Sequence, residues 1–370
     1  MLEKRHYTRV GSATSGRLGC LDWGRGLCVV LMMATHGLYG WVRPEDQARP
    51  FFQWMWLLGG FPGAVFLFIS GLVLALAADG MHRRGERPRA VLRAGLARGL
   101  EILGFAFLFR SWMFASGHFG APWDLLRVDV LNCIGASLLV VGVVALPWPR
   151  RAARIAAALA MAVAIVALTP LTWDSTLARR LPVGLAGYID GRQPGSFFPP
   201  FPWAGFAALG AAAGVLLASW RGRGREAHLF GGMAAVGAVL IPLGLWADRV
   251  SPPVYPRYDF WHTSPAYFAV KAGIVLLTLA AAYVFDQLPG QGPIRQLGRT
   301  SLLVYWVHLE IVYGDHVVPG ARGNLPLGQA VVAVAILMLA MLALSYARTA
   351  RWPFFRGAEV NPAPLIVRRR

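Results

Sequence analysis

Two ionisable residues stand apart because they interrupt a stretch that is otherwise apolar and long enough to cross a bilayer. Residues 21–41 read LDWGRGLCVVLMMATHGLYGW and hold Asp22 and Arg25 near one end and His36 near the other. Charged groups in such a stretch are costly, so they are functional candidates by default. The step of eleven residues from Arg25 to His36 spans about 16 Å of helix with about 20° of angular drift, which predicts both side chains on one helix face.

Composition predicts the class of protein that surrounds this face. The 370 residues are 56% hydrophobic and 15% charged, with 14 Trp, so a soluble chain of this balance would aggregate. Apolar runs of about twenty residues recur between charged connections, as in a polytopic membrane protein. The net charge of +18 is explained by basic cytosolic loops rather than by nucleic acid binding. Two of the three cysteines, Cys28 and Cys133, lie in apolar runs, and no metal-type spacing links the three, so we interpret them as core residues and expect no metal site.

We predict about ten transmembrane helices in one all-α domain over residues 1–370. The predicted spans are residues 21–41, 57–78, 92–109, 130–146, 155–171, a sixth that ends near Trp220, 229–246, 265–285, 300–318 and 327–347. With a cytosolic N-terminus, the inner connections hold more than twice as many basic residues as the outer ones, which is a strong positive-inside bias. Both tails, residues 1–19 and 350–370, are therefore predicted in the cytosol, the second against anionic lipid headgroups.

This orientation assigns depths to the polar residues within the spans. Arg25 and Arg98 lie near the cytosolic surface, and Glu101 is placed to pair with Arg98 on one helix face. His36 lies towards the external side and His308 near mid-membrane. Each has a structural alternative: Arg25 could snorkel to headgroups, and either histidine could be a neutral core imidazole.

Four further polar residues have an ordinary structural explanation. His118, Asp124 and His262 lie on outer loops, where solvated residues are the norm, and Lys271 is shallow enough to snorkel. We interpret the Trp residues at span ends, Trp41, Trp148, Trp220 and Trp246, as an interfacial belt. The Gly-rich helices are better explained by close helix packing than by phosphate binding.

The residues around Arg25 and His36 resemble the first span of membrane acyltransferases related to heparan-alpha-glucosaminide N-acetyltransferase. An Arg and a His separated by ten residues also occur in O-acyltransferases of bacterial surface polysaccharides. Other matching pieces are GGFPGAVFLFISG at 59–71, LRVDVLNCIGAS at 126–137, FPPFPWAGF at 198–206 and LGRTSLLVYWVHL at 297–309. An Arg-x-x-Arg of the polysaccharide branch has its counterpart in Arg84 and Arg87. The resemblance therefore extends over nearly the whole chain.

The resemblance implies transfer of an acyl group, acetyl above all, from cytosolic acetyl-CoA to an external glycan or amino-sugar acceptor. It assigns His36 as general base or transient acyl carrier and His308 as a second acid/base or an orienting partner. Arg25, Arg98, Arg84 and Arg87 suit the phosphates of CoA.

Three residues are supporting candidates: Asp22, Asp129 and Asn132. The implied location is the bacterial inner membrane, where a homodimer is compatible with the sequence. One departure matters, because the lysosomal enzyme places its histidine after the first span, where this chain reads FFQWMWLLGG. The acceptor specificity of that enzyme is therefore not carried over.

Two other classes of protein remain open from the sequence. In a transporter or flippase the same histidines would relay protons or line a path for a sugar lipid, although no internal repeat supports this reading. In a structural or assembly protein, buried Arg and His would be costly without purpose. Labelled acetyl-CoA separates the three classes.

Overall fold

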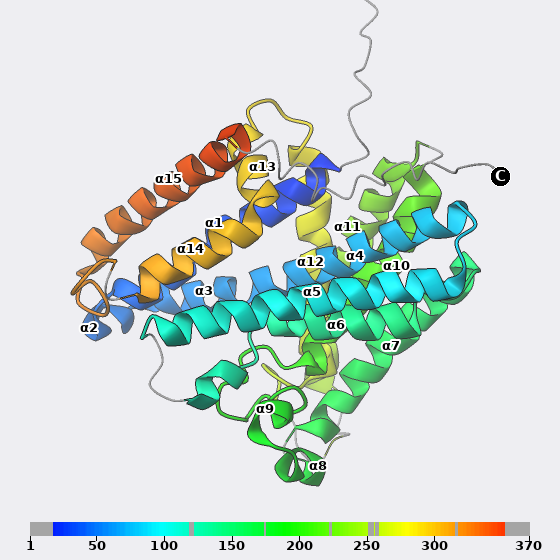
Figure 1. Ribbon diagram of the computed structural model, residues 1–370, viewed down its shortest axis with the longest axis horizontal. Coiled ribbons are helices and arrows are strands. Elements are labelled where there is room, and N and C mark those ends of the chain that lie inside the picture. Colours follow the sequence, from blue (N-terminus) through cyan, green and yellow to red (C-terminus); the bar gives the residue numbers. More distant parts are fainter. Residues whose placement is uncertain are drawn as a thin grey trace, which may run out of the picture.

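In the computed structural model every regular element of the described chain is a helix, which confirms the all-α prediction (Figure 1). The structure describes residues 18–117, 122–173, 175–221, 224–250, 255, 259–314 and 317–351. The predicted tails, apart from a few residues at their inner ends, and the outer-loop residue His118 lie outside this part. The helices are α1 (Gly19–Trp41), α2 (Pro44–Gln47), α3 (Pro50–Gly59), α4 (Phe61–Arg83), α5 (Pro88–Ala115), the 3-10 helix η1 (Pro122–Leu126), α6 (Val130–Val144), α7 (Arg151–Thr172), α8 (Thr176–Arg180), α9 (Val183–Ala186), α10 (Pro200–Arg221), α11 (Glu226–Val250), α12 (Pro265–Phe285), α13 (Gly292–Arg299), α14 (Ser301–Tyr313) and α15 (Leu327–Arg351).

Each of the ten predicted spans overlaps one of these helices. Six are long and apolar enough to cross a membrane: Pro50–Arg83, Arg151–Thr172, Pro200–Arg221, Glu226–Val250, Pro265–Phe285 and Leu327–Ala350. Helices α6 and α14 are apolar but shorter. Helices α1 and α5 have 23 and 28 residues, and both carry charged side chains. The number of ten and the orientation of the termini stay predictions.

Glycine lets the helices pack with their backbones in contact. Helix α4 packs along α10, and a Cβ atom on Gly71 would collide with the carbonyl oxygen of Ala207, just as one on Gly210 would collide with that of Phe68. Helix α5 packs on α6, α7 on α10, and α11 on α12. Close packing therefore accounts for the glycines at these helix contacts, as predicted.

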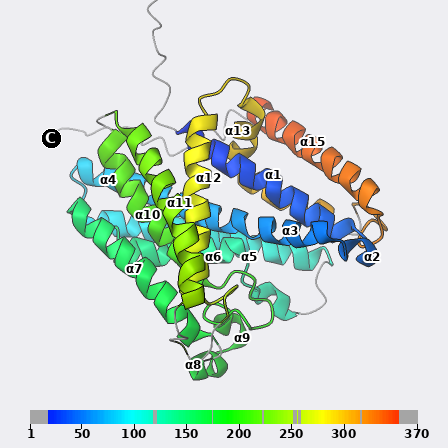
Figure 2. The same ribbon diagram turned by 180° about the vertical axis from the view of Figure 1, so that it is seen from behind.

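Helix α1 contacts α13, α12, α15, α14 and α4, so it lies between α12 and the C-terminal helices (Figures 1 and 2). Three of the apolar residues at its middle, Cys28, Val29 and Met33, are almost fully buried. Trp41 is only 3% exposed, and its indole N–H donates to the carbonyl of Val312 at 3.1 Å. Trp41 is therefore part of the core and not of an interfacial belt, because α14 covers the end of α1.

The bundle has two chemically different ends. We call the end at which α1, α5 and α7 begin the arginine-rich end. We call the end at which α1 finishes and α10 and α12 begin the aromatic end. Helices α8 and α9 and the 3-10 helix η1 lie at the aromatic end (Figure 1). Two of the helices that face it begin with side-chain caps, Asp129 on α6 and Ser264 on α12.

A buried carboxylate joins two helices at the arginine-rich end. Asp79, near the end of α4, is fully buried and accepts hydrogen bonds from Arg151 at 2.8 and 2.9 Å and from Arg154 at 2.8 Å. Arg154 is itself 2% exposed, and Arg83 lies 3.4 Å from the same carboxylate. The start of α7 is thereby held to α4 by the buried Asp79–Arg154 pair, to which the partly exposed Arg151 adds two further hydrogen bonds.

Candidate active site

His36 and His308 lie in direct contact between α1 and α14. Their Nδ1 and Nε2 atoms, respectively, are 2.9 Å apart. The ring planes differ by only 4° and the centroids are 5.3 Å apart. The centroid separation is much longer than the nitrogen–nitrogen distance, so the two rings lie edge to edge in nearly one plane rather than face to face. This is the geometry of an N–H···N hydrogen bond.

The backbone decides which nitrogen of this pair carries hydrogen. His308 Nδ1 lies 2.7 Å from the carbonyl oxygen of Val304, which can only accept, so Nδ1 must donate. In a neutral imidazole the other nitrogen, Nε2, then accepts the hydrogen bond from His36 Nδ1. His36 Nε2 is thereby left unprotonated, with its lone pair available. His308 is fully buried and does not line the cavity, so it can influence a ligand there only through its hydrogen bond to His36.

His36 lines a cavity of about 550 Å³ at the aromatic end. This volume lies within the range of roughly 300–1,000 Å³ that is typical of small-molecule sites. The walls come from α1, α3, α10, α12 and α14 and from the loops before α10 and α12. Its aromatic lining residues are Tyr39, Trp56, Trp173, Phe197, Trp203, Phe206, Trp261, Tyr267, Phe268 and Tyr313.

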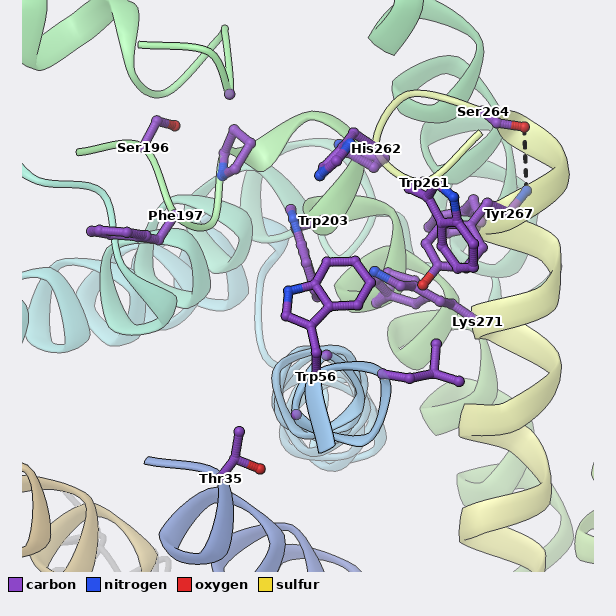
Figure 3. A pocket seen from close by; sticks show the side chains of 18 of the residues that line it. Thr35, Trp56, Ser196, Phe197, Trp203, Trp261, His262, Ser264, Tyr267 and Lys271 are labelled. Carbon is purple, nitrogen blue, oxygen red and sulfur yellow. Dashed lines mark hydrogen bonds between the residues drawn. The ribbon is translucent and has the colours of Figure 1, made fainter. Parts of the chain in front are cut away.

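Apart from the histidines and tyrosines, Lys271 is the one ionisable side chain among the described residues that line this cavity. Its ammonium lies 4.5 Å from the ring centroid of Trp203 and 4.6 Å from that of Tyr267. Figure 3 shows the lysine side chain extending from α12 among these rings, with Trp56 on the facing helix. The expectation that Lys271 snorkels is therefore replaced by a cation held against two aromatic faces inside a cavity.

His262 lines the same cavity but differs from His36 in its surroundings. Its side chain is about half exposed, and its Nδ1 is 2.8 Å from a carboxylate oxygen of Asp259. It lies near the loop wall of the cavity together with Trp261 (Figure 3). This agrees with the expectation of a solvated outer-loop histidine, and it makes His262 a matched control for His36.

The two predicted supporting residues on α6 lie near the site without touching His36. Asp129 caps α6, forms an ion pair with Arg110 at 2.7 Å, and accepts from the Tyr305 hydroxyl at 3.5 Å. The Tyr305 ring in turn packs edge-on against His308, with centroids 6.1 Å apart. Asn132 donates to the Tyr188 hydroxyl at 3.1 Å. Burial raises the pKa of that hydroxyl above its ordinary value, and the bond from Asn132 offsets part of the rise.

Asp22 lies at the other end of α1 from His36, beside cations. Its carboxylate oxygens are 3.8 Å from Arg25 and 3.8 Å from Arg299 of α13. Asp22 therefore orients arginines and is not a partner of His36. Arg25 keeps a side chain that is one-quarter exposed, so it faces solvent or lipid at the arginine-rich end.

The other predicted arginines lie on a different part of that end. Arg84 and Arg87 belong to the turn between α4 and α5, where Arg87, Arg89 and Arg93 border an open hollow of about 480 Å³. Arg98 forms the predicted ion pair with Glu101 at 2.7 Å, and both side chains are about half exposed. Helix α5 packs on α6 whereas α1 packs on α13, so the structure does not join Arg25 and Arg98 in one site (Figures 1 and 2).

Sequence reasoning missed most of the cavity wall. Trp203 and Phe206 belong to the matching piece at 198–206, Lys271 was noticed only as a residue that could snorkel, and Tyr313 had no local signal. No group of His, Cys, Asp and Glu side chains in the described ranges is arranged to hold a metal ion.

The comparison with known families identifies the family of the chain. A family model described as "Heparan-alpha-glucosaminide N-acetyltransferase, catalytic" matches residues 17–247, more than half of the chain. The chain belongs to this family. A search of curated proteins returns no significant match. The matched range includes Arg25 and His36 and ends before Lys271 and His308, so membership in this family of membrane acetyltransferases rests on α1 to α11.

Proposed function

We propose that the protein is a bacterial plasma-membrane acyltransferase that moves an acetyl group from cytosolic acetyl-CoA to a sugar or glycan on the external side. In this orientation the arginine-rich end faces the cytosol and the aromatic cavity faces outwards. Anionic lipid surrounds the basic connections. A homodimer is compatible with this arrangement and stays a prediction.

The single observation that carries the proposal is the free Nε2 atom of His36 at a cavity wall. The hydrogen-bonded series from Val304 through His308 to His36 selects the tautomer in which this atom has a lone pair. A base or nucleophile must present its lone pair to the substrate, whereas a structural histidine uses both nitrogens in hydrogen bonds.

The chemistry needs only what the cavity supplies. A thioester is already activated, so His36 Nε2 either takes the proton of the acceptor hydroxyl or amine as it attacks, or takes the acetyl group itself as the CoA thiolate leaves. The tetrahedral oxyanion needs a hydrogen-bond donor. Tyr313 lines the cavity with its ring centroid 5.9 Å from that of His36, and we assign its hydroxyl to this role.

The donor is held at the arginine-rich end. Arg25 and His36 are about 16 Å apart along α1, so a phosphate group at Arg25 leaves that length of carrier to reach the imidazole. Arg84, Arg87 and Arg98 lie on a different part of that end, where Arg98 pairs with Glu101. We therefore assign the phosphate beside α1 to Arg25, and to the other three arginines the attraction of the anionic donor to this surface.

The test is acetyl transfer from radiolabelled acetyl-CoA by the purified full chain in proteoliposomes. We expect His36→Ala to lower transfer by about 100-fold to 10,000-fold, the usual contribution of general acid–base catalysis. His262→Ala removes an imidazole from the same cavity, but one that is paired with Asp259, and is expected to lower transfer far less than His36→Ala does. Size-exclusion profiles of both variants check that they remain folded.

Two results would contradict the proposal. Full transfer by folded His36→Ala protein would remove His36 from the chemistry. Movement of a labelled sugar lipid across the membrane without any acetyl transfer would instead identify a transporter, the alternative that the sequence leaves open.

A further inference from the structure

Lys271 is an exception in the composition of the chain. Lys4 and Lys271 are its only lysines, and the other 34 basic residues are arginines. Lys271 lies in the second turn of α12, and its ammonium rests on the faces of Trp203 and Tyr267. Within the described ranges no carboxylate pairs with it, although arginines such as Arg43, Arg110 and Arg151 do have such partners.

The described part of the cavity wall therefore presents a positive charge without a counterion. The lining residues within that part include no Asp and no Glu. Cation–π contacts stabilise the ammonium without neutralising it, so its remaining hydrogen-bond donors are available to a ligand. Such a cavity favours an occupant that brings a negative charge to the position beside Trp203.

The lining residues favour a carboxylate over a phosphate as the negatively charged group of the ligand. None of the described residues that line the cavity is an arginine, whereas phosphate sites typically use bidentate arginine or free N–H groups at a helix N-terminus. The first turn of α12 borders the cavity, but Ser264 Oγ already accepts from the N–H groups of Ala266 and Tyr267, the latter drawn in Figure 3. One ammonium is matched in charge by a carboxylate, which carries a single charge.

The remaining wall suits the apolar faces of a sugar ring. Trp56 and Trp261 meet edge to face with centroids 6.1 Å apart, and Trp261 packs against Tyr267 at 5.1 Å. Large rigid rings of this kind supply contact area at low entropic cost.

We propose that this cavity selects an acceptor sugar that bears a carboxylate, and that Lys271 is the residue that binds the carboxylate. For the transfer step the inference rests on the proposed function. Binding of the sugar does not require acetyl transfer and can be measured separately.

Three methyl glycosides that differ only at C6 test the inference by calorimetry on the detergent-solubilised full chain. Methyl glucuronide carries a carboxylate, methyl glucoside a hydroxymethyl group, and methyl glucoside 6-phosphate a phosphate. We expect the wild type to bind the glucuronide about 10-fold to 100-fold more tightly than the glucoside, the range for a hydrogen bond to a charged group. We expect the phosphate to bind more weakly than the glucuronide.

Substitutions assign this preference to one side chain. Lys271→Met is expected to abolish the preference for the glucuronide and leave the glucoside affinity unchanged, while Lys271→Arg keeps the preference. The control is Arg127→Met, because Arg127 lies over the ring of Phe197 at the cavity wall but is already paired with Asp124 at 2.6 Å. Arg127→Met is expected to leave all three affinities unchanged.

Each other outcome overturns the inference. These outcomes are equal wild-type affinity for glucuronide and glucoside, no binding of the glucuronide, tighter binding of the phosphate, or a preference that survives Lys271→Met. Acetyl transfer is then measured with the same sugars as acceptors. Preferential binding of the glucuronide without transfer from acetyl-CoA would contradict the proposed function and leave the binding site standing, so the two failures are distinguishable.

Discussion

The hydrogen bond between His308 and His36 makes a quantitative prediction about a residue that lies outside the cavity. His308→Leu removes the acceptor of the His36 Nδ1–H group while keeping an apolar side chain of similar size. The Val304 carbonyl stays paired through the helix. His36 Nδ1 then has no partner at that side, and the ring loses both its orientation and the preference for a free Nε2 atom.

The expected magnitude follows from the burial of the contact. His308 is fully buried and its Nε2 is 2.9 Å from His36, so the unpaired donor in the variant costs about 1–3 kcal/mol. If His36 avoids this cost by adopting the other tautomer, the productive tautomer becomes less favourable by the same free energy, and kcat falls about 5-fold to 150-fold. KM for acetyl-CoA is expected to stay constant, because His308 does not line the cavity and lies away from the arginine-rich end.

The measurement is steady-state acetyl transfer in proteoliposomes, compared with His308→Gln as the matched variant. The Gln side chain carries an acceptor oxygen at a similar reach, so it is expected to restore a large part of kcat relative to His308→Leu. Thermal melting of the detergent-solubilised variants checks their folding. Wild-type kcat in His308→Leu, or equal losses in the Leu and Gln variants, would refute the argument that an acceptor at this position selects the tautomer.

Two further predictions concern stability. Gly71→Val is expected to destabilise the fold by about 1–3 kcal/mol or more, and so to lower the melting temperature, because the new Cβ meets the Ala207 carbonyl. Gly104→Val is the control, since a Cβ at Gly104 has no neighbour within 4 Å, and its melting temperature is expected to stay close to that of the wild type. Asp79→Asn leaves the buried Arg154 and the partly exposed Arg151 of α7 without their charge partner and is expected to cost about 3–5 kcal/mol, most of it at Arg154. Glu101→Gln, which removes a half-exposed pair, is expected to cost about 0–1 kcal/mol in the same melting experiment. An equal effect of the two glycine variants, or of the two carboxylate variants, would contradict the packing and burial arguments respectively.

The sequence by itself was sufficient for the all-α class and for the approximate positions of the longer helices. Apolar runs of twenty residues and basic connections are local patterns, so each predicted span overlaps a helix. The family resemblance, carried by the residues around Arg25 and His36, was likewise confirmed by the family match. The Arg98–Glu101 pair was predictable because a spacing of three residues on a helix determines it.

Only the tertiary structure decided which polar groups meet. His36 and His308 are 272 positions apart, and their contact, its coplanar geometry and the tautomer it selects depend on how α14 packs on α1. Arg25 and Arg98 share a predicted depth but lie on helices with different packing partners. Depth is a property of one helix and can be read along the chain, whereas the direction of a side chain relative to other helices is set by packing. For the same reason Lys271, which looked like a residue that snorkels, became the charged group of an aromatic cavity.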